Sequence, residues 1–321
     1  MANLTSMNGF YLMGFSDDRK FQILHALLFL ATYVLALIGN ILIITITTLD
    51  HRLHSPMYYF LKHLSLLDLC FISVTVPQSI ANSLVNNGYI SFGQCILQVF
   101  FFIALASSEV AILTVMSYDR YVAICQPLRY EIIMDPCSCK HAVIAVWVAG
   151  GLSGLLHTVV NFSIPLCGER IIHQFFCDVP QMLKLACSYE FINEIAVAAF
   201  TTSAAFVCLI SIIFSYVHIF SAVLRIPTAE GRTKVFSTCL PHLFVVTFFL
   251  SAAGFEFLRP PSDSLSAMDL MFSIFYTVIP PTINPVIYSL RNEAMQAALR
   301  KILSKEEFAQ RKIYLKAMFK L

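Results

Sequence analysis

The sequence predicts an all-α membrane protein built as a bundle of seven transmembrane helices. Hydrophobic residues make up 58% of its 321 residues and charged residues 12%, against about 45–50% and about 25% in soluble domains. Mean hydropathy is +0.75, and apolar runs of membrane-spanning length recur along the chain. This composition excludes a disordered chain, a collagen, a coiled coil and a soluble enzyme. The net charge of +2 provides no basic surface for nucleic acid.

Each apolar run is long enough to cross a bilayer as a helix. Helices are expected because a lipid-exposed backbone must satisfy its own hydrogen bonds, and no run alternates with the period of a barrel strand. The expected spans are Leu24–Leu49, Met57–Leu84, Ile96–Val122, Ala142–Leu166, Ile195–Leu224, Val235–Phe257 and Leu265–Leu290.

The distribution of Lys and Arg predicts the orientation of the chain. With the N-terminus outside, the outer segments hold five Lys and Arg residues and the inner segments fifteen, as the positive-inside rule requires. We therefore expect an extracellular tail over residues 1–23, a receptor domain over 24–290 and a cytoplasmic tail over 291–321, in a multi-pass protein of the plasma membrane. The tail over 1–23 lacks the apolar core of a signal peptide, so the first span is expected to act as an uncleaved anchor. Asn3 begins a glycosylation sequon on the outer side.

Four cysteines, Cys95, Cys167, Cys177 and Cys187, fall on the predicted outer side, where oxidising conditions allow disulfides. Four cysteines permit three pairings, and their spacing does not choose among them.

The tail after the last span has an amphipathic pattern. Its apolar residues recur at helical spacing beside basic residues: Met295, Ala298, Leu299, Ile302 and Leu303, flanked by Arg300, Lys301 and Lys305. This pattern predicts a helix on the anionic inner leaflet, in contact with membrane lipids. A solvated basic tail is the alternative.

Two motifs lie at the predicted cytoplasmic ends of spans. The sequence Tyr118-Asp119-Arg120-Tyr121 closes the third span, where an ionisable pair indicates function. The sequence Asn284-Pro285-Val286-Ile287-Tyr288 closes the seventh span, where proline removes a helix hydrogen bond and creates a deformable point.

Together these motifs resemble those of the rhodopsin-like G-protein-coupled receptors. Further motifs narrow the resemblance to the odorant (olfactory) receptors: PMYYFL at 56–61, MSYDRYVAIC at 116–125, SY at 215–216, KVFSTC at 234–239 and PVIYSLRN at 285–292. The resemblance covers nearly the whole chain. Two departures from the family pattern are Gln126 in place of histidine, and Phe249-Leu250-Ser251 in place of a Phe-Tyr-Gly triplet. The second departure brings into question an activation switch that uses the tyrosine.

The resemblance implies an odorant-sensing receptor, not an enzyme. It would bind a small hydrophobic volatile and activate a stimulatory, olfactory-type G protein that raises cAMP. Implied disulfides join Cys95 to Cys177 and Cys167 to Cys187. The residues implied in coupling and activation are Asp119, Arg120, Tyr121, Tyr216, Asn284, Pro285 and Tyr288.

The family binds its odorant in the outer half of the bundle, among spans three, five, six and seven and under the second outer loop. Helical spacing selects residues on the faces that would line this pocket, which is apolar with a few hydroxyl groups. They are Phe102, Ile103, Ala106, Ser107, Val179, Phe200, Thr201, Ala204, Ala253, Gly254, Phe257, Ile274 and Thr277. Each of them could instead serve only in helix packing.

Two acids, Asp68 and Glu109, are predicted at similar depth within the bundle. Two like charges in a low dielectric cannot both stay ionised without compensation. One solution is a proton shared by the pair. The other is a bound cation, because receptors of this fold hold sodium beside the acid of the second span, here with Asn40 and Asn284 nearby. No other cofactor or metal is expected.

Two other classes of protein fit the sequence less well. The sequence Gly151-Leu152-Ser153-Gly154 matches the G-x-S-G of rhomboid proteases, with His242 as the candidate base, but the two side chains lie at depths that differ by roughly 7–8 Å. A transporter would be expected to show internal repeats, and the two halves of this chain are not similar.

Overall fold

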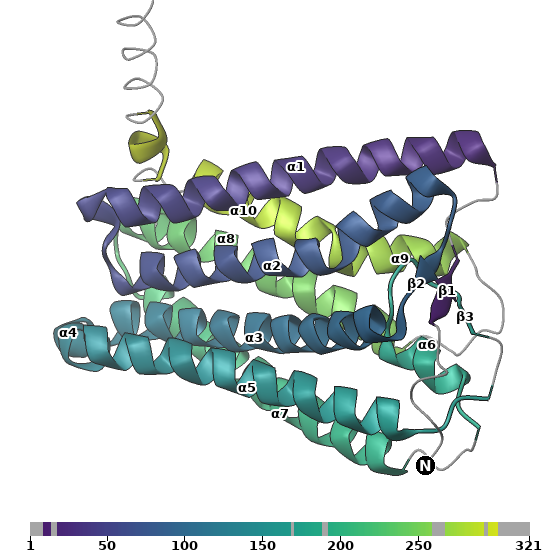
Figure 1. The fold of residues 1–321 in the computed structure, drawn as a ribbon. Helices are drawn as coiled ribbons and strands as arrows, with labels where there is room; N and C mark the ends of the chain where they lie inside the picture. Colours follow the sequence, from purple (N-terminus) through teal and green to yellow (C-terminus); the bar gives the residue numbers. More distant parts are fainter. Residues whose placement is uncertain are drawn as a thin grey trace, which may run out of the picture.

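The computed structural model describes residues 9–13, 18–167, 170–187, 192–258, 267–291 and 295–300. Within these ranges the fold is a bundle of long helices that run side by side, with a small sheet at one end (Figure 1). Asn3 lies outside the described residues, as do the side chains at Ala253, Gly254 and Phe257.

The long helices match the expected spans closely. They are α1 (Arg19–Leu49), α2 (Pro56–Val85), α3 (Phe92–Cys125), α5 (Pro136–Ser163), α7 (Ile192–Leu224) and α8 (Ala229–Leu258). Among the described residues, α1, α2, α3, α5 and α7 are long and apolar enough to cross a membrane, whereas α8 contributes a shorter apolar stretch, Cys239–Phe248.

The expected seventh span is two helices rather than one. A single residue, Val278, separates helix α9 (Ala267–Thr277) from helix α10 (Ile279–Arg291). Pro280 and Pro281 follow the break at Val278. Proline has no N–H to donate to the preceding turn, but it fits the first turn of a new helix, where no such bond is needed. The prolines therefore explain why the helix restarts here.

Helix boundaries follow local capping chemistry. At the start of α3, Ser91 and Gln94 form a reciprocal capping box. At the start of α5, Asp135 accepts a hydrogen bond from the backbone N–H of Ser138. Hydrogen bonds from the Ser138 hydroxyl and backbone also lower the pKa of the Asp135 carboxyl group. Helix α2 ends at Asn86, whose φ of 55° is the left-handed conformation typical of a helix C-terminus.

One end of the bundle carries a three-stranded sheet that the sequence did not predict. Strand β1 (Phe10–Leu12) lies between β2 (Tyr89–Ile90), antiparallel to it, and β3 (Ile171–Ile172), parallel to it. Phe10 is buried, so part of the expected N-terminal tail packs onto the bundle. Gly88 permits the close approach, because a Cβ there would lie 2.2 Å from the Leu12 carbonyl oxygen.

Two disulfides lie at this same end. Cys95 of α3 is bonded to Cys177, and Cys167 is bonded to Cys187, which is the pairing that the family resemblance implied. Short helix α6 (Val179–Lys184) follows Cys177 directly. The connection between α5 and α7 is thus tied to the top of α3.

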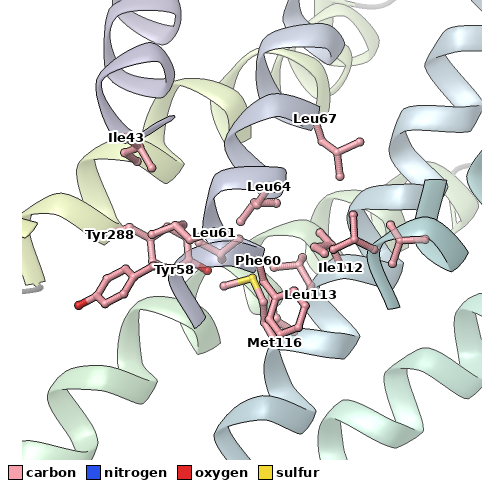
Figure 2. Packing of buried hydrophobic residues seen from close by; sticks show 14 of the residues in the cluster. Ile43, Tyr58, Phe60, Leu61, Leu64, Leu67, Ile112, Leu113, Met116 and Tyr288 are labelled. Atoms are coloured by element: carbon pink, nitrogen blue, oxygen red, sulfur yellow. The ribbon is translucent and has the colours of Figure 1, made fainter. Parts of the chain in front are cut away.

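The opposite end holds η2 (His51–Leu53), η3 (Pro127–Arg129) and α4 (Tyr130–Ile133). The largest buried cluster lies toward this end, where Phe60, Leu64, Leu113 and Met116 meet between α2 and α3 (Figure 2). Residues 295–300 are helical, and their Met295 packs against the same cluster. The rest of the expected amphipathic tail lies outside the described residues.

Apolar side chains also cover much of the outside of the bundle. Only 22% of the residues in the most apolar stretch of α1, and 28% of those in the most apolar stretch of α7, are buried. Leu35, Ile38 and Phe206, among others, are at least 60% exposed. Water-soluble monomers rarely expose so many large apolar side chains together. The outer surface therefore suits a lipid environment.

Candidate functional site

The predicted ligand-binding residues of α3 and α9 surround a cluster of aromatic rings. Phe102 of α3 lies with its ring centroid 5.1 Å from that of Phe176, which comes from the segment between β3 and α6. Tyr276 of α9 lies 6.2 Å from Phe102 and 6.4 Å from Phe176. Ile274 packs against Phe175 and Phe176. The loop thus reaches into the region where the odorant pocket is expected.

The loop segment is anchored on both sides of its two phenylalanines. The Gln174 side-chain oxygen accepts a hydrogen bond of 2.8 Å from the Ser273 hydroxyl of α9. The Cys177 backbone N–H donates at 2.8 Å to the side-chain oxygen of Gln98 in α3. Phe175 and Phe176 are 2% and 0% exposed. Sequence reasoning placed the loop over the pocket but missed that its aromatic pair enters the bundle.

The other predicted ligand-binding residues divide into several groups. Ile103 and Val179 pack on the buried cluster around the Cys95–Cys177 disulfide, Ala106 packs on the main core, and Thr277 is buried in α9. Ser107 donates a hydrogen bond to Ser153 of α5 at 3.0 Å.

Two predicted ligand-binding residues of α7 are exposed. Phe200 is 67% exposed and Ala204 is also exposed. Phe200 and Ala204 thus lie on a face of α7 that is not packed against other helices, and their predicted contact with ligand stays a prediction.

Thr201, the remaining predicted residue of α7, belongs to a polar cluster that the sequence did not reveal. His157 of α5 lies with Nδ1 2.7 Å from Glu194 Oε1 and with Nε2 3.1 Å from the Thr201 hydroxyl oxygen. Thr201 itself donates to a backbone carbonyl of its own helix, so His157 Nε2 donates to Thr201. The Glu194 side chain is buried, and its Oε2 atom has no hydrogen-bond partner. The signal in the sequence was a carboxylate, Glu194, in the first turn of α7, directly before the apolar run.

Four polar side chains predicted to form an ion site lie buried in the middle of the bundle. Asp68 and Asn40 are 0% exposed, Glu109 is 1% and Asn284 is 4% exposed. Asn284 donates to both carboxylate oxygens of Asp68, at 3.2 and 3.1 Å. Glu109 interacts electrostatically with Asp68. The structure thus brings Asp68, Glu109 and Asn284 into one group.

The Asn40 side chain forms a hydrogen bond to the backbone of α10. Its amide nitrogen donates to the Pro281 carbonyl at 2.9 Å and to the Ala36 carbonyl at 3.0 Å. The Pro281 carbonyl would normally accept from the residue four positions later, but that residue is Pro285, which has no N–H. Asn40 therefore replaces the hydrogen bond that Pro285 removes. Gly39 allows this contact, since a Cβ there would lie 2.8 Å from the Pro285 Cβ.

This polar group has acceptor oxygens to spare. Glu109 Oε1 and Asn40 Oδ1 are buried and have no hydrogen-bond partner. Unpaired buried acceptors are costly, and hard cations bind to carboxylate and amide oxygens. The residues present therefore fit a small cation as well as they fit a proton held between two carboxyl groups. Among the described residues, no group of three or more His, Cys, Asp or Glu side chains could hold a metal ion.

Near the C-terminal end of α3, Asp119 and Arg120 form a closed ion pair, in which the two side chains bond to each other. Arg120 donates through Nε and Nη2 to Asp119 Oδ2, and the Asp119 side chain is 0% exposed. Tyr130 of α4 donates its hydroxyl proton to the other oxygen, Oδ1, at 2.8 Å. Burial and the Asp119 charge raise the pKa of Tyr130, so the phenol stays protonated and continues to donate. The sequence did not predict this contact, because the separation of Tyr130 and Asp119 along the chain does not indicate that their side chains meet.

Tyr121, beside this pair, accepts a hydrogen bond from Gln126 at 3.1 Å. Gln126 is the residue that departs from the family pattern. The bond joins the end of α3 to the turn that follows it.

The predicted Tyr216 is linked to α8 and α3 through His242. His242 Nε2 lies 3.0 Å from the Leu113 carbonyl oxygen, which only accepts, so Nε2 carries the proton. Its Nδ1 then accepts from the Tyr216 hydroxyl at 2.6 Å. His242 is thus engaged on both sides and Ser153 bonds to Ser107. The protease alternative fails because the candidate base and nucleophile are not paired with each other.

Comparison with known proteins gives consistent matches. A family model described as Olfactory receptor matches residues 29–306. The chain is 83% identical over 321 residues to Olfactory receptor 14J1 of Homo sapiens, which covers 100% of both chains. It is 53% identical over 303 residues to Olfactory receptor 14A16 of Homo sapiens, covering 94% of this chain and 98% of that one. It is 42% identical over 301 residues to Olfactory receptor 1G1 of Gorilla gorilla gorilla, covering 94% and 96%.

Proposed function

The chain belongs to the olfactory receptor family, and on that premise we propose that it is a plasma-membrane receptor for small hydrophobic volatiles that activates a stimulatory, olfactory-type G protein and raises cAMP. Members of this family are odorant-sensing G-protein-coupled receptors and not enzymes. The chain is accordingly a membrane receptor. Its G protein, its second messenger and the class of its ligand are the parts that we propose.

The proposed topology has seven spans, an extracellular N-terminus and a cytoplasmic C-terminus. Helices α9 and α10 together form the seventh span. The excess of Lys and Arg on one side supports this orientation. So does the location of both disulfides at the opposite end of α3 from Asp119 and Arg120. In this orientation Asn3 is available for N-glycosylation, and the tail after α10 contacts inner-leaflet lipids.

The proposed odorant site is the region around Phe102 and Ile274, in the outer half of the bundle. Apolar and aromatic side chains predominate there, and the hydroxyl groups of Ser107, Thr201 and Thr277 bond to neighbouring protein groups. Such a site favours ligands that gain from burial of carbon, about 0.8 kcal/mol per CH₂ group. We retain Ala253, Gly254 and Phe257 of α8 as proposed contributors from the sixth span.

One observation carries the proposal of G-protein coupling: the Asp119–Arg120 pair is buried, closed and capped by Tyr130. Arg120 lies within electrostatic range of Tyr216. In the signalling state Arg120 leaves Asp119 and contacts the G protein, while Tyr216 and Tyr288 move with α7 and α10. Asn284 and Pro285 supply the deformable point in α10, because the backbone there lacks one helix hydrogen bond.

Asp68, Glu109, Asn40 and Asn284 would hold a sodium ion that stabilises the resting receptor. Their unpaired oxygens support this assignment. The ion would supply positive charge to two carboxylates that cannot otherwise both remain ionised in the bundle. A proton shared by Asp68 and Glu109 is the competing arrangement.

Replacing Arg120 by Ala tests coupling directly. We expect loss of odorant-evoked cAMP with surface staining unchanged, because the variant keeps the fold but removes the group that contacts the G protein. Arg129→Ala is a matched control, since Arg129 is an exposed basic residue at the same end of the bundle. Full signalling by the Arg120→Ala receptor would reject the proposal.

A further inference from the structure

The Phe176 side chain occupies a place that a ligand could take. Its ring is completely buried, yet it comes from a loop rather than from one of the bundle helices. It packs against Phe102 of α3, Tyr276 of α9 and its own neighbour Phe175. Phe102 and Ile274, which touch this aromatic pair, are themselves residues that the sequence selected for odorant binding. A protein side chain therefore fills part of the proposed odorant site.

The groups that anchor the loop do not include this ring. The two hydrogen bonds that fix the segment involve the Gln174 side chain and the Cys177 backbone. The adjacent disulfide ties Cys177 to Cys95. Phe176 contributes only ring contacts to the packing described above, so a rotation of its side chain would leave these anchors intact. Rotation would free a volume about the size of one benzene ring.

The walls of that volume indicate what would replace the ring. Aromatic rings attract one another in offset and edge-to-face arrangements with centroids about 4.5–7 Å apart. Phe176 lies at such distances from Phe102 and Tyr276, and a third ring, Phe71, backs Phe102 at 5.1 Å. A planar aromatic ligand would regain these contacts, whereas a saturated ring of the same size would regain only its dispersion contacts.

We propose that Phe176 is an intramolecular stand-in for the odorant, and that the ligand of this receptor is a small benzenoid volatile that binds by taking the place of the Phe176 ring between Phe102 and Tyr276. This inference rests on the proposed odorant-binding function and names its ligand class. It also makes Phe176 a determinant of sensitivity, because the ligand must compete with a side chain that is always present.

The first test measures binding without any G protein. Receptor purified in detergent is melted with and without toluene, as wild type and as Phe176→Ala. The variant has a benzene-sized apolar cavity, and such cavities bind benzene-like molecules. We expect its apparent melting temperature to fall by several degrees and toluene to restore most of the loss, since a ligand that binds only the folded state stabilises it. Methylcyclohexane should restore clearly less.

Two further variants give this test its controls. Phe102→Ala combined with Phe176→Ala removes one aromatic wall and should abolish the preference for toluene over methylcyclohexane. If Phe176→Ala does not reach the membrane, Phe176→Val, which removes the ring and still leaves part of the cavity, is melted in its place. Equal rescue by toluene and methylcyclohexane would contradict the proposal that the ligand is aromatic. Absence of rescue by either solvent would contradict the proposal that the Phe176 ring occupies the place of the ligand.

The second test measures cAMP in cells for a panel of benzenoid volatiles. A site that a side chain fills most of the time loses apparent affinity in proportion to the fraction of time that it is open, so Phe176→Ala should lower the half-maximal concentration of benzenoid agonists several-fold. Phe60→Ala is the control, because Phe60 is an equally buried phenylalanine in the core at the other end of the bundle, and it should bring no such gain. An unchanged or higher half-maximal concentration would contradict the proposal. If no volatile raises cAMP in the wild-type receptor or in Phe176→Ala, the proposed function fails. The melting experiment then still tests whether the Phe176 ring occupies the place of the ligand.

Discussion

Replacing Tyr130 by Phe removes a single hydroxyl group from the closed pair at the end of α3. The ring remains, so packing around α4 is conserved. The hydroxyl donates to Asp119 Oδ1 at 2.8 Å, while Arg120 occupies Oδ2. In the variant, Oδ1 of a carboxylate whose side chain is 0% exposed loses its donor. In the open signalling state water can reach the same oxygen, so the cost falls on the resting state.

The size of the effect follows from these contacts. A hydrogen bond to a charged group contributes about 1.5–3 kcal/mol. Tyr130 is only half-buried, so water can partly replace its hydroxyl group, and the lower end of that range applies. Since about 1.4 kcal/mol corresponds to a factor of ten, the ratio of signalling to resting receptor should rise about tenfold. We therefore expect basal cAMP to increase by about that factor.

The assay is cAMP in transfected cells without odorant, normalised to surface receptor. Tyr118→Phe is the matched control, because Tyr118 adjoins Asp119 but is 46% exposed; it should leave basal cAMP unchanged. The raised pKa of Tyr130 keeps its phenol protonated, so the stabilisation is fully present below the ordinary tyrosine pKa of about 10 and is lost only above it. The basal difference between variant and wild type should therefore be constant from about pH 6 to pH 8. Basal signalling equal to that of wild type would refute the role assigned to Tyr130.

Two further predictions concern the outer end and the middle of the bundle. Cys95→Ser and Cys177→Ser should each prevent surface expression, and the double variant should be no worse than either single variant, because both remove the same bond; additive losses measured by surface staining would contradict this. Raising sodium at fixed ionic strength should lower basal and odorant-evoked cAMP, and Glu109→Gln should weaken that dependence. A sodium response that survives in Glu109→Gln, with a dependence on pH near neutrality instead, would favour the proton shared with Asp68.

The helices were predictable because their signals are local. Apolar runs of spanning length predicted six of the long helices to within a few residues at most ends, and the capping residues Ser91 and Asp135 mark two of their starts. The seventh run was predicted as one span because its apolar character continues through Val278. The two prolines that follow could have indicated the break, but proline also occurs inside α2 and α8 without ending them.

The contacts between distant segments were not predictable in the same way. Strand β1 has only three residues, and nothing in Phe10–Leu12 specifies that its partners are β2 and β3. The Tyr130–Asp119 and His157–Glu194 bonds join side chains 11 and 37 residues apart, and no sequence period connects them. The exposure of Phe200 and Ala204 depended on how α7 is rotated against its neighbours, which its nearly uniform apolar composition leaves open.

The amino-acid sequence by itself determined that the chain is a helical membrane protein of the olfactory receptor family, because span length, composition and the Asp119–Arg120 and Asn284–Pro285 motifs are properties of contiguous residues. Only the tertiary structure decided what these motifs touch. Asn40 replaces the hydrogen bond that Pro285 lacks, Tyr130 completes the shell of Asp119, and Phe176 fills the space beside Phe102. The physical reason is that hydrogen bonds and ring contacts act over a few ångströms, so their partners are selected by the packing of whole helices and not by order along the chain.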